Sequence, residues 1–137
     1  MDTGGMCKTL EDVNCNTADM IQDATRKQLP WLKKTMAERR SKNGKVSSIL
    51  FMHIPLSQHQ VAFEKEQGTD QCSPGVMADG EVANIGGMDN TDIFDAINGI
   101  EEIKTVVVGH NHCNDFCCKY GSRGLQLCFG RHSGRGG

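Results

Sequence analysis

Two short apolar runs stand out in the pattern of hydrophobic and polar positions, at residues 46–52 and 104–108. Both are rich in aliphatic and β-branched side chains and both end at turn-forming residues. Runs of this length are typical of strands buried in a parallel sheet. A further apolar stretch predicts another strand at residues 125–129.

Helical spacing of apolar positions marks two other segments. Residues 17–40 follow a helical pattern that Pro30 interrupts, which predicts two helical pieces or a kink. The basic residues at the end of this segment are interpreted as a solvated helix end. Residues 89–97 predict a short capped helix. Because helical and strand-like segments alternate, the predicted fold class is α/β.

Two segments have little periodicity. Residues 1–16 are predicted to be the tail of a strand followed by a loop, and residues 56–87 are predicted to be a long loop. A loop of this length beside a site is more often functional than a linker.

Composition narrows the possible functions. The 137 residues suffice for one domain, and 37% hydrophobic with 23% charged residues suits a folded protein. A net charge of −2 and few aromatic residues argue against a nucleic-acid partner. No stretch approaches the roughly 20 apolar residues of a membrane span, and the N-terminus lacks the pattern of a signal peptide.

Histidines follow both of the first two predicted strands. His53 comes directly after residues 46–52, and His110 and His112 come after residues 104–108, separated from them by Gly109. Ligands gather outside the carboxyl ends of parallel strands, and side chains at i and i+2 of an extended chain point the same way. Neutral imidazole is a good ligand for Zn, Fe, Ni or Cu. We therefore predict a metal site here, with burial in the core as the alternative for His53 and Gly109 allowing the backbone to leave the strand sharply.

The cysteine content is high and leaves several alternatives open. Seven cysteines occur in the chain. A zinc site of His112, Cys113, Cys117 and Cys118 is one alternative, because imidazole and thiolate are the usual structural ligands. Adjacent cysteines do not readily point at one metal from an extended chain, so burial or disulfides are favoured for them.

Three further polar residues are assigned from their local context. Asp115 either orients a ligand imidazole or caps a turn. His59 and His132 are interpreted as surface or loop histidines.

The motifs resemble a known superfamily. Residues 109–112 resemble the Gly-His-x-His signature of the calcineurin-like metallophosphoesterases, and residues 51–56 resemble the histidine block that precedes it. Residues 114–117 and 128–134 are similar to the purple-acid-phosphatase-related branch found in fungi, plants and protists.

The earlier part of the chain carries the same resemblance. Asp2-Thr3-Gly4-Gly5 resembles the end of a strand that precedes a helix, and Gln28-x-x-Trp31-Leu32 resembles the Gln-x-x-Trp helix of this branch. The resemblance therefore spans nearly the whole chain, in order.

The resemblance implies a hydrolase that acts on phosphate esters at a dinuclear metal centre, a phosphatase. The two ions would be divalent or trivalent (Fe, Zn or Mn), with His53 and His110 on one and His112 on the other. Paired ions of this kind activate a water or hydroxide for attack on phosphorus. The implied fold is the C-terminal half of an α/β/β/α sandwich, with residues 1–137 forming a partial domain.

Other ligand motifs of this family do not occur in the sequence: Asp-x-His, Gly-Asp-x-x-Asp and Gly-Asn-His followed by Glu or Asp. Asp2 does not restore the first of these, because Thr3 and Gly4 follow it. We therefore expect a C-terminal fragment of a longer enzyme that lacks the N-terminal metal-binding half and has negligible activity alone. The alternative function is a catalytically inactive remnant that serves as an interaction or metal-binding module.

Overall fold

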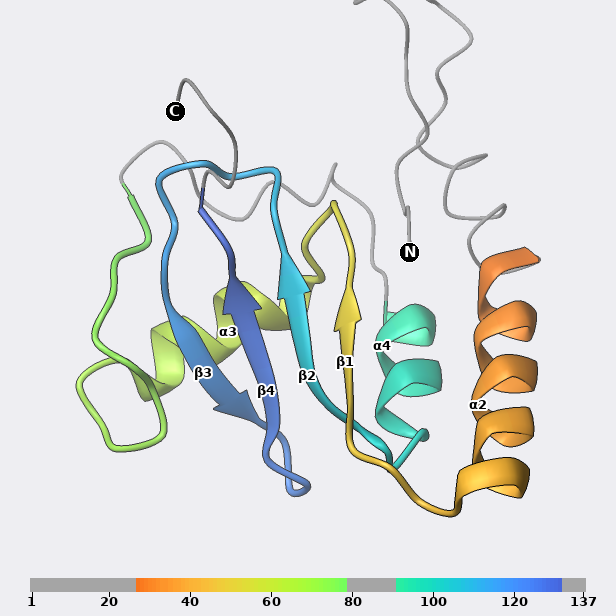
Figure 1. Ribbon diagram of the computed structural model, residues 1–137. Coiled ribbons are helices and arrows are strands. Elements are labelled where there is room, and N and C mark those ends of the chain that lie inside the picture. The colour runs from red at the N-terminus through yellow and green to blue at the C-terminus, as the bar shows by residue number, and fades with distance from the viewer. Residues whose placement is uncertain (1–26, 79–90, 132–137) are drawn as a thin grey trace, which may run out of the picture.

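The computed structural model describes residues 27–78 and 91–131. In these residues four strands form one mixed sheet with the order β1-β2-β4-β3 (Figure 1). The strands are β1 (Ser48–Phe51), β2 (Ile103–Val108), β3 (Cys117–Tyr120) and β4 (Leu125–Phe129), and the helices are α2 (Leu29–Asn43), α3 (Ser57–Glu66) and α4 (Thr91–Asn98). The predicted α/β class is confirmed. None of these helices is long and apolar enough to cross a bilayer.

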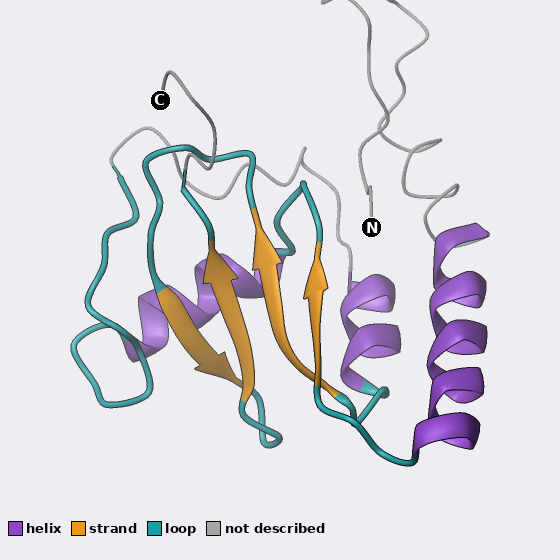
Figure 2. Cartoon of the chain, in the orientation of Figure 1, coloured by secondary structure: helices purple, strands orange, loops and turns teal. Residues whose placement is uncertain are grey.

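Three of the strands point the same way. β1 pairs with β2 and β2 pairs with β4 in parallel, whereas β3 is antiparallel to β4. Parallel neighbours need a crossover connection, and the connection from β1 to β2 contains α3 and α4. The carboxyl ends of β1, β2 and β4 therefore meet at one edge of the sheet (Figure 2).

One face of the sheet carries the hydrophobic core. Alternate strand positions such as Leu50, Val106 and Leu127 are buried there, as the two-residue period of a strand requires. In contrast, Ile49 and Phe51 on β1 are 59% and 65% exposed. Among residues 27–78 and 91–131, the side chains that pack against the sheet therefore lie mainly on one of its faces.

Aromatic side chains join α3 to this core. The ring of Phe63 on α3 lies 4.5 Å, centroid to centroid, from that of Phe116, which lies 5.0 Å from that of Phe129 on β4. From α4, the Phe94 ring lies 5.3 Å from that of Tyr120 on β3. Packing of this kind gives most helices in proteins their stability.

Helix α2 begins where the kink was predicted. Pro30 lies in its first turn, where a residue without a backbone N–H is tolerated. Residues 27 and 28 just before α2 are π-helical, so the helical geometry changes close to this proline. Leu29 and Leu32 are buried in the core. Gly44 ends the helix with a φ of 71°, a left-handed conformation suited to glycine. The rest of the predicted helix and the N-terminal segment lie outside the described residues.

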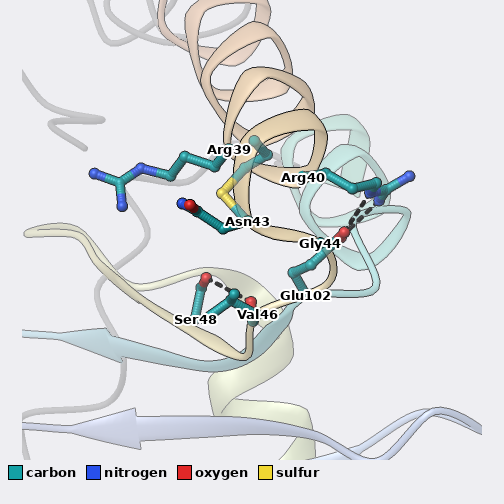
Figure 3. A pocket seen from close by; sticks show the side chains of 8 residues that line it. Arg39, Arg40, Asn43, Gly44, Val46, Ser48 and Glu102 are labelled. Atoms are coloured by element: carbon teal, nitrogen blue, oxygen red, sulfur yellow. Dashed lines mark hydrogen bonds and ion pairs between the residues drawn. The ribbon is translucent and has the colours of Figure 1, made fainter.

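The C-terminal end of α2 is fastened by an ion pair. Arg40 donates to both carboxylate oxygens of Glu102, and the bond from Nη2 to Oε2 is 2.7 Å long (Figure 3). This pair borders a small cavity of about 60 Å³ between α2 and β1. The Arg40 guanidinium holds the pKa of Glu102 below its usual value. Other basic residues of this helix, including Lys33 and Arg39, are exposed, as predicted for a solvated helix.

Two elements differ from the predictions. Helix α3 lies within residues 56–87, which were predicted to be loop, and β3 was not predicted. The sequence of α3 is mostly polar and buries few apolar side chains, among them Ala62 and Phe63, so its helical period is weak. β3 is four residues long and is paired with β4, a contact that no local pattern encodes.

Arg123, in the turn between β3 and β4, binds the end of α4. Its guanidinium donates to Asn98 Oδ1 at 3.1 Å and to the carbonyl of Ile103 at 2.8 Å. Asn98 is the last residue of α4 and Ile103 is the first residue of β2, so Arg123 contacts both elements. This contact joins α4 to the turn that sets the start of β4.

Candidate functional site

The predicted histidines lie at the carboxyl edge of the parallel strands. The backbone N–H of Gly109, just beyond β2, donates to the carbonyl of His53, just beyond β1, at 3.1 Å. Two residues earlier on β1, Phe51 is paired with Val107. The continuing register therefore places the two histidine-bearing segments side by side.

His53 and His110 are in direct ring contact. Their ring centroids are 5.4 Å apart and the rings are nearly perpendicular. His53 is exposed, so the alternative that it is a buried core histidine is wrong. His112 follows two residues after His110 and is also exposed. The structure thus joins two of the three predicted ligands and leaves the third nearby in the same loop.

The backbone at His110 is in an unusual conformation. Its φ is 68°, in the left-handed region that residues other than glycine rarely occupy. We expected Gly109 to provide the sharp exit from the strand, but the left-handed turn falls one residue later. A hydrogen bond of 2.8 Å from Asn111 N to the carbonyl of Gly109 closes this turn. Such conformations persist where the surrounding structure holds them, and they gather at functional sites.

The described residues do not fit a complete dinuclear metal centre. Across residues 27–78 and 91–131 no three His, Cys, Asp or Glu side chains are grouped so that they could hold a metal ion. Two imidazoles can occupy two positions on one ion. A two-metal site also needs carboxylates, because neutral imidazoles do not offset the charges of two cations. The ligand set of His53, His110 and His112 therefore stays a prediction.

Asp115, in the same loop as His110, has other partners. One carboxylate oxygen lies 3.0 Å from Arg131 Nη2, and the other accepts a hydrogen bond of 2.7 Å from the backbone N–H of Val76. These contacts are neither of the two roles predicted for Asp115, because its partners are a guanidinium and a backbone N–H 39 residues away rather than an imidazole or its own turn. The bond to Val76 joins the loop of residues 109–116, called here the histidine loop, to the segment that follows α3.

Asn114 reinforces this contact. Its side chain is fully buried, and Oδ1 accepts a hydrogen bond of 2.9 Å from Ala78 N. Gly75 passes so close that an added Cβ would lie 2.8 Å from the carbonyl oxygen of Asp115. Neither Asn114 nor Arg131 was predicted to be a functional residue. The available signal for Arg131 was its position directly after Gly130, at the end of a predicted strand.

The cysteines next to the histidine loop form disulfides. Cys72 is bonded to Cys118 and Cys117 to Cys128, so two adjacent residues of β3 are linked to different neighbours. The alternative zinc site is therefore wrong, because two of its four predicted ligands are bonded to other cysteines. Cys113 is exposed, and the N-terminal cysteines lie outside the described residues.

His59 was predicted to be a surface or loop histidine, and this prediction is wrong. His59 lies in the first turn of α3 and is fully buried, with its ring 5.5 Å from that of Phe129. Burial penalises the charged form and lowers its pKa to about 4. The other predicted surface histidine, His132, lies outside the described residues.

Comparison with known proteins adds a distant relationship. No protein-family profile and no solved structure matches the chain. A curated protein of Arabidopsis thaliana, "Probable inactive purple acid phosphatase 29", is 31% identical over 94 residues, which cover 69% of this chain. The chain is distantly related to a purple acid phosphatase. It spans only 22% of the length of that relative. The resemblance stated from the motifs is confirmed at this coarse level.

Proposed function

We propose that this chain contributes histidine ligands to a metal-dependent phosphoesterase centre and does not hydrolyse phosphate esters by itself. The observation that carries the proposal is the contact between His53 and His110 at the carboxyl edge of the parallel strands. The relationship to a purple acid phosphatase supports the reaction class. Following the family pattern, His53 and His110 would bind one ion and His112 a second, with iron, zinc or manganese as candidates.

The absence of activity follows from the charges at the site. The nearest carboxylate described in the histidine loop, that of Asp115, already binds Arg131 and the Val76 backbone. The ligand motifs that supply carboxylates in this family do not occur in the sequence. The word "inactive" in the name of the Arabidopsis relative is consistent with a domain of this family that has lost activity.

Hydrolysis of p-nitrophenyl phosphate tests the catalytic part of the proposal. We expect the full chain, supplied separately with zinc, manganese or iron, to release p-nitrophenolate no faster than metal and buffer alone. The proposal is contradicted if the chain hydrolyses this ester above that blank and the His110→Ala variant abolishes the hydrolysis.

Competition with a chromogenic zinc chelator tests the metal part. We expect His53→Ala and His110→Ala each to weaken zinc binding by at least about tenfold, since each removes a direct ligand. The matched variant His112→Ala should leave this first site nearly unchanged. Zinc binding that neither of the first two variants alters would exclude the predicted ligand pair. A chain that neither binds zinc nor hydrolyses the ester would instead support the second candidate function, a non-catalytic interaction module.

A further inference from the structure

The disulfide between Cys72 and Cys118 has one accessible end. Cys118 lies on β3 and is fully buried, whereas Cys72 is only partly buried in the segment that follows α3. Cys72 also lines a cavity of about 350 Å³ between the end of α3 and this segment. A thiol from solvent can therefore reach the sulfur of Cys72 but not that of Cys118.

The cavity has the size and the lining that a small polar ligand needs. Its volume is within the range of about 300 to 1,000 Å³ that is usual for small-molecule sites. Phe63 forms an apolar part of the wall, and the side chains of Gln67 and Ser73 supply hydrogen-bond donors and acceptors. A peptide-like thiol such as glutathione matches this lining, because its amides and carboxylates are hydrogen-bonding groups.

The segment that carries Cys72 also holds the histidine loop. Residues 71–78 run antiparallel to residues 114–119, beside β3 (Figure 1). Val76 N donates a hydrogen bond of 2.7 Å to Asp115 Oδ1, and Asp115 N donates one of 3.2 Å to the carbonyl of Val76. Opening the disulfide of Cys72 removes a covalent constraint from this row of contacts and leaves the hydrogen bonds to hold the histidine loop.

We propose that a small thiol of the glutathione type exchanges with this disulfide at Cys72 and thereby loosens the histidine loop. The thiolate of the small thiol attacks the Cys72 sulfur, so that a new S–S bond forms between them and the bond to Cys118 breaks. Cys118 leaves as a thiolate and takes up, through water, the proton that the small thiol had released. A second small thiol then attacks the sulfur of the first, which yields the oxidised dimer of the small thiol and leaves Cys72 as a thiol.

Access decides where this reaction begins. The rate of thiol–disulfide exchange depends on which sulfur the thiolate can reach. The stability that each disulfide gives to the fold is a separate quantity, because it does not measure how open a sulfur is to attack. The cavity beside Cys72 therefore favours this disulfide as the first to react.

Treatment of the folded full chain with reduced glutathione tests the position of the exchange. After an acid quench and alkylation, peptide mass mapping should show glutathione on Cys72 and an alkylated Cys118 in the first product. The disulfide Cys117–Cys128 should still be closed at that stage. Earlier opening of Cys117–Cys128 would overturn the proposal, as would a folded chain that does not react at all.

A substitution that narrows the cavity tests the role of access. In Gln67→Trp the larger side chain occupies part of the cavity, so the reaction at Cys72 should be at least about threefold slower than in the unaltered chain. The matched variant Val61→Trp places the same ring at an exposed position of α3 that does not line the cavity, and it should react at the unaltered rate. Equal rates in all three proteins would overturn the assignment of the cavity.

Hydrogen exchange tests the loosening of the histidine loop. With glutathione on Cys72, the amides of Val76 and Asp115 should exchange at least about tenfold faster than in the untreated chain, because their hydrogen bonds open locally more often. The amides of β2 should keep their protection. Unchanged exchange at Val76 and Asp115 would overturn the coupling, as would an equal acceleration in β2, which would mean that the whole fold had loosened.

Discussion

At the scale of single residues, His59 illustrates how burial changes the chemistry of a side chain. Its Nδ1 lies 3.3 Å from the backbone nitrogen of Leu56 at the start of α3. Its Nε2 is buried near the Val106 backbone without a hydrogen bond of good geometry. Burial separates the ring from bulk solvent and so disfavours an imidazolium, which keeps His59 neutral in the folded protein until the pH is low.

We expect His59 to make the protein less stable in mild acid. Below pH 6.5 the unfolded chain binds a proton at this histidine, whereas the folded chain does so only below its pKa of about 4. Protons therefore favour the unfolded state, and the free energy of unfolding should fall by about 3 kcal/mol as the pH drops from 6.5 to 4. Urea denaturation across this range measures the loss. The His59→Phe variant keeps the ring contact and removes the titrating group, so its free energy of unfolding should depend less steeply on pH in this range. An unchanged pH dependence would rule out His59 as its source.

For the site, the local sequence pattern predicts where the histidines lie but not their backbone conformation or their contacts. The histidines were predicted as ligands because His53 directly follows one apolar run and His110 and His112 lie just beyond another, and their position after the strand ends is confirmed. The left-handed backbone of His110 and the contact of Arg131 with Asp115 were not predicted. Both depend on how three strand ends lie against each other, which no window of sequence contains.

At the scale of elements, α2 depends on a few anchors. Leu29 and Leu32 are buried near its start. Near its end, Arg40 forms an ion pair with the buried carboxylate of Glu102. Most of its other residues are exposed. A helix with so small an apolar face gains little from burial alone, so the ion pair sets the position of its C-terminal end.

We expect the attachment of α2 to weaken in acid. The pKa of Glu102 is lowered in the folded protein by its hydrogen bond with Arg40, so the pair stabilises the fold fully above the ordinary pKa of a glutamate. This stabilisation is lost as the pH falls through the lowered value. Hydrogen exchange should show faster exchange of the α2 amides in Glu102→Gln at neutral pH, while the β2 amides stay protected. The variant Lys45→Met, which removes the exposed pair with Glu101, is the control. Equal α2 exchange in Glu102→Gln and the unaltered chain would refute this role.

At the scale of the whole molecule, two disulfides hold the β3 side of the sheet together. Cys72–Cys118 fastens the segment after α3 to β3, and Cys117–Cys128 fastens β3 to β4. Backbone hydrogen bonds lie beside the disulfides, including one of 2.8 Å from Lys119 N to the carbonyl oxygen of Gln71. The short edge strand β3 is thereby cross-linked to both of its neighbours.

We expect the two disulfides to stabilise the fold unequally. The bridges span 46 and 11 residues of sequence, and the entropy of loop closure predicts about 4 and about 3 kcal/mol for them. Thermal or urea unfolding of Cys72→Ala/Cys118→Ala should therefore reveal a larger loss than that of Cys117→Ala/Cys128→Ala. When dithiothreitol is added, the stability of each double variant should approach that of the reduced unaltered chain. A larger loss for the shorter bridge would show that packing, not loop closure, sets the effect.

Much of the fold follows from the sequence by itself. Short apolar runs predict the strand at residues 125–129 and the strands β1 and β2. The positions of the histidines that follow β1 and β2 are read from the same pattern. A run of apolar residues and the turn residues that bound it are local properties, so they can be recognised without knowing any tertiary contact. The α/β class follows from the order of these segments.

Only the tertiary structure decided which parts meet. It formed α3 and β3 from segments with weak local patterns, buried His59, paired the cysteines and brought Arg131 to the histidine loop. Each of these depends on contacts between residues that are distant in sequence, such as Cys72 with Cys118 and Asp115 with Val76. Their free energy arises from burial and pairing in the folded core, which a local period does not specify.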